Sequence, residues 1–236
     1  MLDDFPAVIN GIYEYAELFG WGETRSVAID IDTEDGLDEL ALKVEMEKAA
    51  EFELKLASGY TNAQITVAWF HNVTQTLQLE NITVFAFTIS NMDWRLPGGE
   101  DTWARIFTAM PRLDRLEGHS KGAFHLVEVL ASDAAADTLP ALTTLALLYT
   151  DLTYARASTE PGNSSTSWIY LLTFCRIDSR PLQRVEIDSC GFGSIPVQTT
   201  VDLLKLTSGT LALPPQLDIS VTSPGSPSEG TPSWQY

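Results

Sequence analysis

Short segments in which apolar and polar residues alternate recur along the chain, a pattern typical of strands with one buried face. The two clearest segments, 142–152 and 182–192, carry apolar residues at the same four positions. Thr150 and Cys190 occupy the same polar position in these two segments. The alternation predicts six strands, at residues 27–31, 52–56, 77–79, 113–116, 142–147 and 182–187.

Between the predicted strands, the apolar residues change to the i, i+3, i+4, i+7 spacing of a helix with one buried side. Asp101, for example, is placed to cap a helix whose apolar stripe runs from Trp103 to Met110. The same spacing predicts helices at residues 5–19, 36–48, 101–110, 122–131, 167–175 and 196–206.

Strands that alternate with helices are typical of parallel strands joined by crossovers, either in a doubly wound sheet or in a solenoid. The two clearest strands fit L-x-x-L-x-L-x-x-[NCT]-x-[LF], the spacing of leucine-rich repeats, which favours the solenoid. We therefore expect an α/β fold for residues 1–213: an irregular leucine-rich-repeat solenoid with a parallel sheet on one side and helices on the other. Uneven distances between the strands predict long insertions at 59–70, 85–100 and 153–166. Residues 214–236 are rich in Pro, Ser and Gly, which predicts a disordered tail.

The charge balance limits the classes of partner. Of the 236 residues, 32 are Asp or Glu and 14 are Lys or Arg, a formal net charge of -18. Such a charge repels nucleic acid and anionic membrane surfaces, so neither is expected as a partner. It serves solubility, or it attracts a protein partner of basic character. The sequence shows neither a basic segment followed by an apolar run nor a long apolar stretch, so we expect an intracellular protein of the cytoplasm or nucleus.

Residues suited to catalysis or metal binding are few and scattered. The three histidines, His71, His119 and His125, lack the spacing of metal ligands. Cys175 falls on the apolar stripe of a predicted helix, and Cys190 falls at the turn position of a leucine-rich repeat, so both are expected to be buried structural thiols. The run 30–36 resembles a calcium loop but lacks the glutamate needed near its twelfth position. We expect no catalytic residue, metal or cofactor. The alternative, an α/β enzyme of unknown reaction, requires a pocket with converging polar groups at the carboxyl ends of the strands.

The predicted strands also define a candidate binding surface. If the strands line one face of a solenoid, the residues between the buried leucines face a partner. Acidic and basic side chains alternate there, which suits a protein surface better than a small-molecule pocket. The residues predicted to bind a partner are Glu53, Lys55, Gln78, Glu80, Arg115, Glu117, Arg184, Glu186 and Asp188.

The order of motifs in the second half resembles a known family. Residues 103–117 lead into a helix ending in L-V-E-V-L, and residues 139–147 and 168–191 follow. This order is similar to the C-terminal region of fungal F-box/leucine-rich-repeat proteins, above all those of mushroom-forming fungi. The resemblance covers residues 100–206 closely and residues 25–99 loosely.

In that family, the repeats recruit a substrate while an N-terminal F-box docks onto the adaptor of a cullin-type ubiquitin ligase. The resemblance therefore implies a substrate-recognition repeat region. Residues 1–19 lack the Leu-Pro-x-Glu opening of an F-box. Binding to a ligase adaptor is accordingly expected only if an F-box lies outside this chain. A degenerate family member without a present role is the third interpretation.

Overall fold

A computed structural model describes residues 5–32, 38–48, 51–58, 74–89, 99–120, 122–130, 138–150, 182–190 and 218–222. The helices in this part are α1 (Phe5–Phe19), the short 3-10 helix η2 (Leu79–Asn81), α3 (Gly99–Thr108) and α4 (Gly122–Leu130). The strands are β1 (Thr24–Asp32), β2 (Asp38–Met46), β3 (Glu51–Ser58), β4 (Val84–Ile89), β5 (Arg115–Ser120), β6 (Thr144–Leu148), β7 (Arg184–Asp188) and β8 (Asp218–Thr222).

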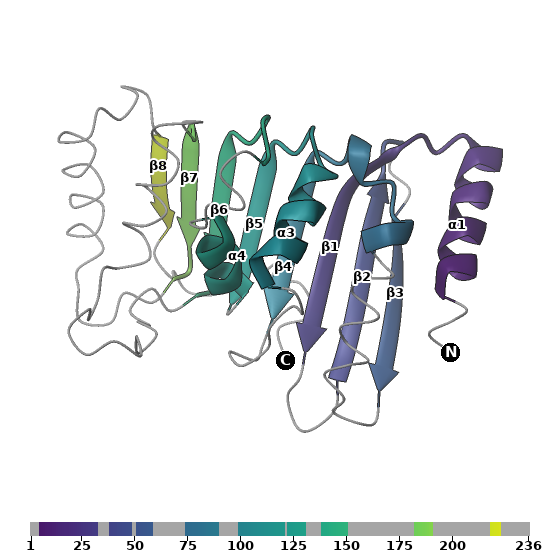
Figure 1. Cartoon of the computed structure of the whole chain (residues 1–236), viewed down its shortest axis with the longest axis horizontal. Coiled ribbons are helices and arrows are strands. Elements are labelled where there is room, and N and C mark those ends of the chain that lie inside the picture. Colours follow the sequence, from purple (N-terminus) through teal and green to yellow (C-terminus); the bar gives the residue numbers. More distant parts are fainter. Residues whose placement is uncertain are drawn as a thin grey trace.

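The described strands form one mostly parallel sheet, in the order β3-β2-β1-β4-β5-β6-β7-β8 (Figure 1). β1 and β4 to β8 run parallel to one another, each paired with its neighbour in the sheet. β2 and β3 extend the sheet beyond β1 as antiparallel strands. The mixed α/β class and the mostly parallel sheet expected from the alternating segments are thereby confirmed.

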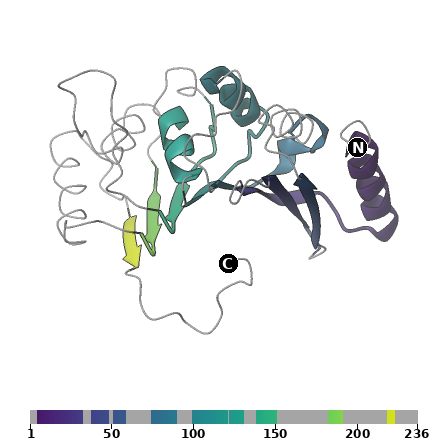
Figure 2. The same ribbon diagram turned by 90° about the horizontal axis from the view of Figure 1, so that it is seen from below.

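α3 and α4 both lie on one face of the sheet (Figure 2). The ring of Trp103 on α3 meets that of Phe87 on β4 edge to face, with 5.1 Å between the ring centroids. Beneath these helices, equivalent positions of successive strands form two buried rows that run across the sheet. The first row is Val27, Phe85, Leu116, Leu145 and Val185, and the second is Ile29, Phe87, Gly118, Leu147 and Ile187.

The chain enters three of the strands through the same turn. The N–H groups of Ile82, Leu113 and Leu142 each donate to the carbonyl three residues earlier, at 3.3, 3.1 and 3.2 Å. We call each strand, together with the turn before it, a unit. The residue after each turn donates its N–H to the carbonyl of the equivalent residue in the preceding unit. This ladder joins Arg25, Thr83, Asp114, Thr143 and Gln183, and its four bonds are all 2.9 Å long.

The strands also end alike. Ser120, Tyr149 and Ser189 each lie four residues after the first buried row and have φ of 51°, 52° and 51°. Beyond them, the buried Thr150 hydroxyl donates to the Ser120 carbonyl, and the buried Cys190 Sγ donates to the Leu147 carbonyl at 3.3 Å. The polar position that the sequence pattern singled out therefore links each unit to the one before it.

Two predicted elements are wrong. Residues 77–79 do not form a strand: Leu79 begins η2, and the strand is β4, which overlaps the predicted insertion 85–100. Ile82, Phe85 and Phe87 occupy the L-x-x-L-x-L positions instead of Leu77 and Leu79. The turn before β4 is closed by the Ile82 N–H, which donates to the Leu79 carbonyl. The predicted helix 36–48 is the strand β2: its apolar residues fit both periods, and pairing with β1 selects the extended one.

The end of the chain also differs from expectation. Residues 218–222 lie in the predicted disordered tail, 214–236, yet they form β8 and pair in parallel with β7. In the backbone register, Ile219 pairs with Val185 and Val221 pairs with Ile187. The predicted helices at 167–175 and 196–206, and the insertions at 59–70 and 153–166, lie outside the described residues.

Gly118 lies in the second buried row, where the neighbouring strands carry Phe87 and Leu147. A small residue is required there because α4 begins immediately after β5 and packs against it. A Cβ on Gly118 would lie 2.7 Å from the Ala123 Cα, which is backbone and cannot move aside. Replacing Gly118 with Ala is expected to lower the free energy of unfolding by about 1–3 kcal/mol. Urea denaturation measures this change.

The matched control is Gly11→Ala in α1, where a Cβ meets nothing within 4 Å. That variant should gain about 0.5–1 kcal/mol from helix propensity. Equal effects of the two substitutions would contradict the close approach of α4 to β5.

Candidate functional site

The face of the sheet opposite α3 and α4 is lined mainly by polar and small residues, and we call it the polar face. Strand alternation places these residues one position away from the buried rows. Parallel register aligns them into three rows across β1, β4, β5, β6 and β7. The rows are Ser26, Val84, Arg115, Thr144 and Arg184; then Ala28, Ala86, Glu117, Ala146 and Glu186; then Asp30, Thr88, His119, Leu148 and Asp188.

A network of charged side chains crosses the polar face from β5 to β7. Arg115 places Nε 2.5 Å from Oε1 of Glu117 and Nη2 2.6 Å from Oε2 of Glu186. Arg184 Nε lies 2.9 Å from the other Glu186 oxygen, and His119 Nε2 lies 3.3 Å from Glu117 Oε2. In the first two rows, β6 presents only the short side chains of Thr144 and Ala146. Arg115 therefore reaches across β6 to β7.

The network holds its carboxylates in the ionised state. The hydrogen bond from Arg115 lowers the pKa of Glu186. The pKa of Glu117 is lowered mainly by its hydrogen bond with His119 and to a smaller extent by the one with Arg115. The same bond to Glu186 raises the pKa of the Arg115 guanidinium. Side-chain exposure of 28% for Arg115, 20% for Glu117 and 19% for Glu186 means that water screens these pairs only in part.

Arg184 is the most exposed member of this network. Half of its side chain, 50%, is accessible to solvent. Asp188, further along β7, accepts a hydrogen bond from the Ser189 hydroxyl at 3.1 Å. Glu186 holds the guanidinium of Arg184 by an ion pair, so the polar face presents both signs of charge in a set arrangement.

The structure bears on metal binding and on Cys190 as a nucleophile. They contain no group of three or more His, Cys, Asp or Glu side chains that could hold a metal ion. Asp30 of the calcium-loop-like run lies in β1, and residues 33–36 of that run are outside the described part. Burial raises the pKa of Cys190, so its thiol is a weak nucleophile at neutral pH.

Most of the predicted binding residues lie on the polar face. Arg115, Glu117, Arg184, Glu186 and Asp188 are brought together there. Glu53 and Lys55 belong to β3, where backbone register continues the second and third rows, and their side chains lie outside the described part. His119 was not among the predicted binding residues, yet its position in β5 and its partner Glu117 place it in the network. The alternation after Leu116 was the signal for it.

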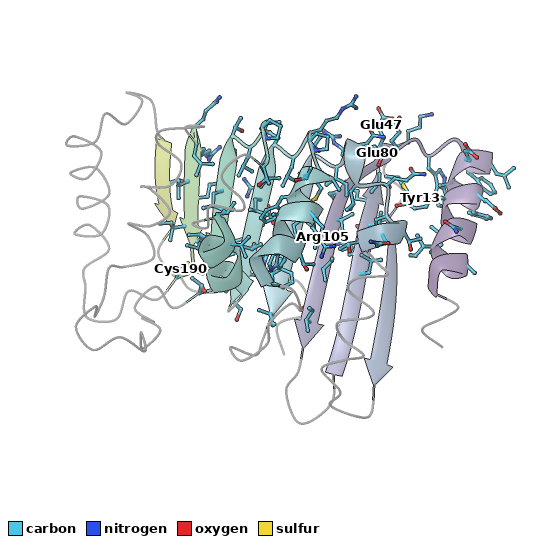
Figure 3. The ribbon with its side chains drawn as sticks, viewed as in Figure 1. Tyr13, Glu47, Glu80, Arg105 and Cys190 are labelled. Atoms are coloured by element: carbon cyan, nitrogen blue, oxygen red, sulfur yellow. The ribbon has the colours of Figure 1, made fainter. Side chains whose placement is uncertain are left out.

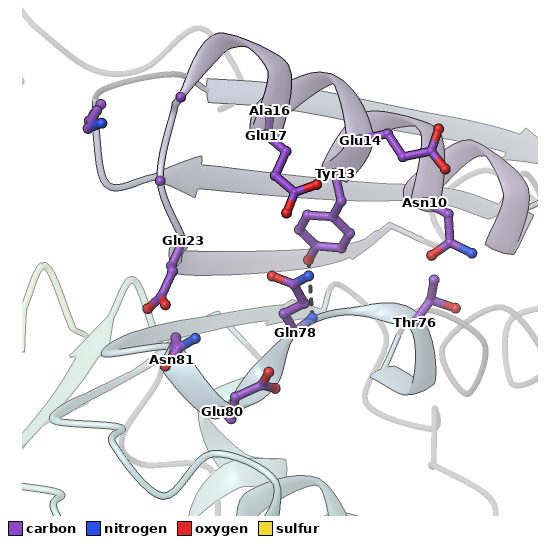
Figure 4. A pocket seen from close by; sticks show the side chains of 13 residues that line it. Asn10, Tyr13, Glu14, Ala16, Glu17, Glu23, Thr76, Gln78, Glu80 and Asn81 are labelled. Atoms are coloured by element: carbon purple, nitrogen blue, oxygen red, sulfur yellow. Dashed lines mark hydrogen bonds between the residues drawn. The ribbon is translucent and has the colours of Figure 1, made fainter.

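The prediction for Gln78 and Glu80 is wrong in its structural basis, since neither residue lies on a strand of the sheet. Both line a cavity of about 760 Å³ between α1 and η2 (Figure 4). Figure 3 shows Tyr13 on α1 and shows both Tyr13 and Glu80 well away from Cys190, which lies toward the β7 end of the sheet. The Gln78 N–H donates to the Tyr13 hydroxyl at 3.1 Å, and this bond ties α1 to the chain before β4.

No family model, curated protein or solved structure matches the chain. Among the described residues, no helix is long and apolar enough to span a membrane.

The contribution of the network to stability should depend on pH. A carboxylate with a lowered pKa stabilises the fold above its ordinary value of about 4.5, and this contribution is lost as the pH falls through the lowered value. Glu186→Gln should therefore cost about 1–2 kcal/mol at pH 7 and progressively less below that value. Urea denaturation of both proteins across pH 3 to 7 tests this.

Glu45→Gln is the matched control, because Glu45 on β2 accepts a hydrogen bond from Ser26 and has no arginine partner among the described contacts. Its effect should be small at every pH. A pH-independent cost for Glu186→Gln would show that the substitution disturbs packing rather than an ion pair.

Proposed function

We propose that this chain is a non-enzymatic protein-binding module, built as a leucine-rich-repeat solenoid, that contacts its partner with the polar face. The observation that carries the proposal is the charged network from β5 to β7 on the face left open by α3 and α4. It holds both signs of charge in fixed positions on a broad surface, which favours recognition of a complementary protein surface over a small molecule.

Four recurring features support the solenoid. The turn before the strands, the ladder from Arg25 to Gln183, the positive φ after the strands and the buried polar residues Thr150 and Cys190 each occur at equivalent positions. From β4 to β6 the spacing is more regular than the sequence indicated, because 31 residues separate Phe85 from Leu116 and 29 separate Leu116 from Leu145. A further 40 residues separate Leu145 from Val185. Stacked units of one supersecondary type are the defining property of repeat proteins.

The resemblance to fungal F-box/leucine-rich-repeat proteins extends the proposal. An intracellular protein of this kind recruits substrates to a ubiquitin ligase through its repeats, and it requires an F-box outside this chain for the adaptor. The messenger RNA that encodes the chain tests this part. An F-box in frame upstream of Met1 supports the ligase role, and a stop codon directly before Met1 removes it while leaving the binding module.

Reversal of the charge at Arg184 should weaken partner binding. Arg184→Glu reverses a half-exposed charge on the polar face without touching the buried rows, and arginine is among the residues that contribute most at interfaces. The immobilised variant is compared with the unchanged chain for proteins captured from cells that express it. At least one protein enriched by the unchanged chain should be lost by about tenfold or more, equivalent to 1.4 kcal/mol.

Arg112→Glu is the control, because it changes the net charge by the same amount. Arg112 is exposed, lies outside the polar face and contacts Asn81. The control should retain every captured protein. If Arg184→Glu retains them all as well, or if the unchanged chain enriches none, the polar face is not the binding surface.

A further inference from the structure

The outer side of α1 exposes apolar residues that the fold leaves in water. Leu18 is 82% exposed, Phe19 59% and Tyr15 51%. The rings of Tyr15, Phe19 and Trp21 form a cluster, with centroid distances of 4.5 Å, 5.5 Å and 5.9 Å. A contiguous exposed apolar patch of this kind, on a helix whose other side is packed, is typical of an interaction surface.

The neighbouring side of α1 is acidic. Glu14 and Glu17 lie one helical turn apart and both line the cavity between α1 and η2 (Figure 4). Glu23 and Glu80 add two carboxylates to its wall, and Lys48 one cation. No Lys or Arg occurs within α1 itself. Leu18 lies between the aromatic cluster and these carboxylates on the helix surface.

The charge pattern restricts what can cover this surface. A second copy of the chain would bring the same carboxylates together, and each copy carries a formal charge of -18. Anionic lipid and nucleic acid are repelled by Glu14, Glu17, Glu23 and Glu80 in the same way. A protein segment that carries both cations and apolar side chains satisfies the two halves of the surface at once.

We propose that α1 and the adjoining cavity form a second docking surface, for a basic amphipathic segment of a partner protein. Its apolar side chains contact Leu18 and the Tyr15–Phe19–Trp21 cluster, and its Lys or Arg side chains enter the cavity and pair with Glu14 and Glu17. Tyr13 supports this arrangement, because its hydroxyl is within hydrogen-bond distance of the Thr24 hydroxyl, at 3.3 Å, and accepts from the Gln78 N–H. These bonds hold α1 against both walls of the cavity.

The probe is a fluorescein-labelled peptide of about 12 residues in which Leu and Phe alternate with Lys and Arg, long enough to cross one helix. Fluorescence anisotropy measures its affinity for the full chain. Two further peptides, one with Glu in place of the cations and one with Ser in place of the apolar residues, should bind at least tenfold more weakly. If the Ser peptide binds as tightly as the amphipathic peptide, the binding is only a general attraction of cations to the acidic chain, and the proposal is overturned.

Variants locate the surface. Leu18→Ser with Phe19→Ser, and separately Glu14→Gln with Glu17→Gln, should each weaken peptide binding about tenfold, while circular dichroism shows an unchanged fold. Glu45→Gln with Glu51→Gln removes the same charge from β2 and β3 and should change binding less than twofold. If that control weakens binding as much as the α1 variants, the surface is not on α1.

Other occupants have distinct outcomes. A dimer of the unchanged chain in sedimentation that is lost in the Leu18→Ser, Phe19→Ser variant would identify a second copy as the occupant. Binding to anionic vesicles that is lost in the same variant would identify a membrane. Either result overturns the proposal. Arg184→Glu should leave peptide binding unchanged, so failure of this proposal and failure of the polar face are separate results.

Discussion

The structure depends on the in-register stacking of apolar rows across parallel strands. Each of these strands contributes one to three large apolar residues to one face, far too few to bury a core alone. The register of β1, β4, β5, β6 and β7 places Val27, Phe85, Leu116, Leu145 and Val185 side by side beneath α3 and α4. A slip of one residue would exchange the two faces of a strand, so the hydrophobic effect fixes the register.

The polar face is a consequence of the same register. When the apolar rows are aligned, the intervening residues are aligned as well, and Arg115 faces Glu186 across the small residues of β6. The ion pairs add little to stability in comparison with the core, since they are partly exposed. Their effect is to order long side chains, and an ordered charged surface loses less conformational entropy when it binds a partner.

The two proposed surfaces differ in construction. The polar face belongs to the parallel part of the sheet and carries both signs of charge. The α1 surface lies at the other end of the sheet, beyond the antiparallel strands, and combines exposed aromatic rings with carboxylates. α1 packs Ile9 and Ala16 inward at this end and exposes Leu18 outward.

Local periodicity was sufficient for much of the fold. The positions of β1, β3, β6, β7, α3 and α4 follow from alternation or helical spacing, and so does the shared role of Thr150 and Cys190. Periodicity failed at 36–48, where the apolar residues fit both the helical and the strand period. It also failed at 77–79, because the pair Leu77 and Leu79 has the same spacing as Phe85 and Phe87 in β4. In both places, pairing with β1 made the choice, and no property of the segment itself could supply it.

The binding residues divide in the same way. The sequence determined that Arg115, Glu117, Arg184, Glu186 and Asp188 are the polar members of their strands, because alternation is a local property of the backbone. Only the tertiary structure decided that Arg115 meets Glu186, 71 residues later, and that Gln78 and Glu80 line a cavity beside α1. Contacts between distant segments depend on which strands become neighbours, and that order is set by the burial of the whole sheet.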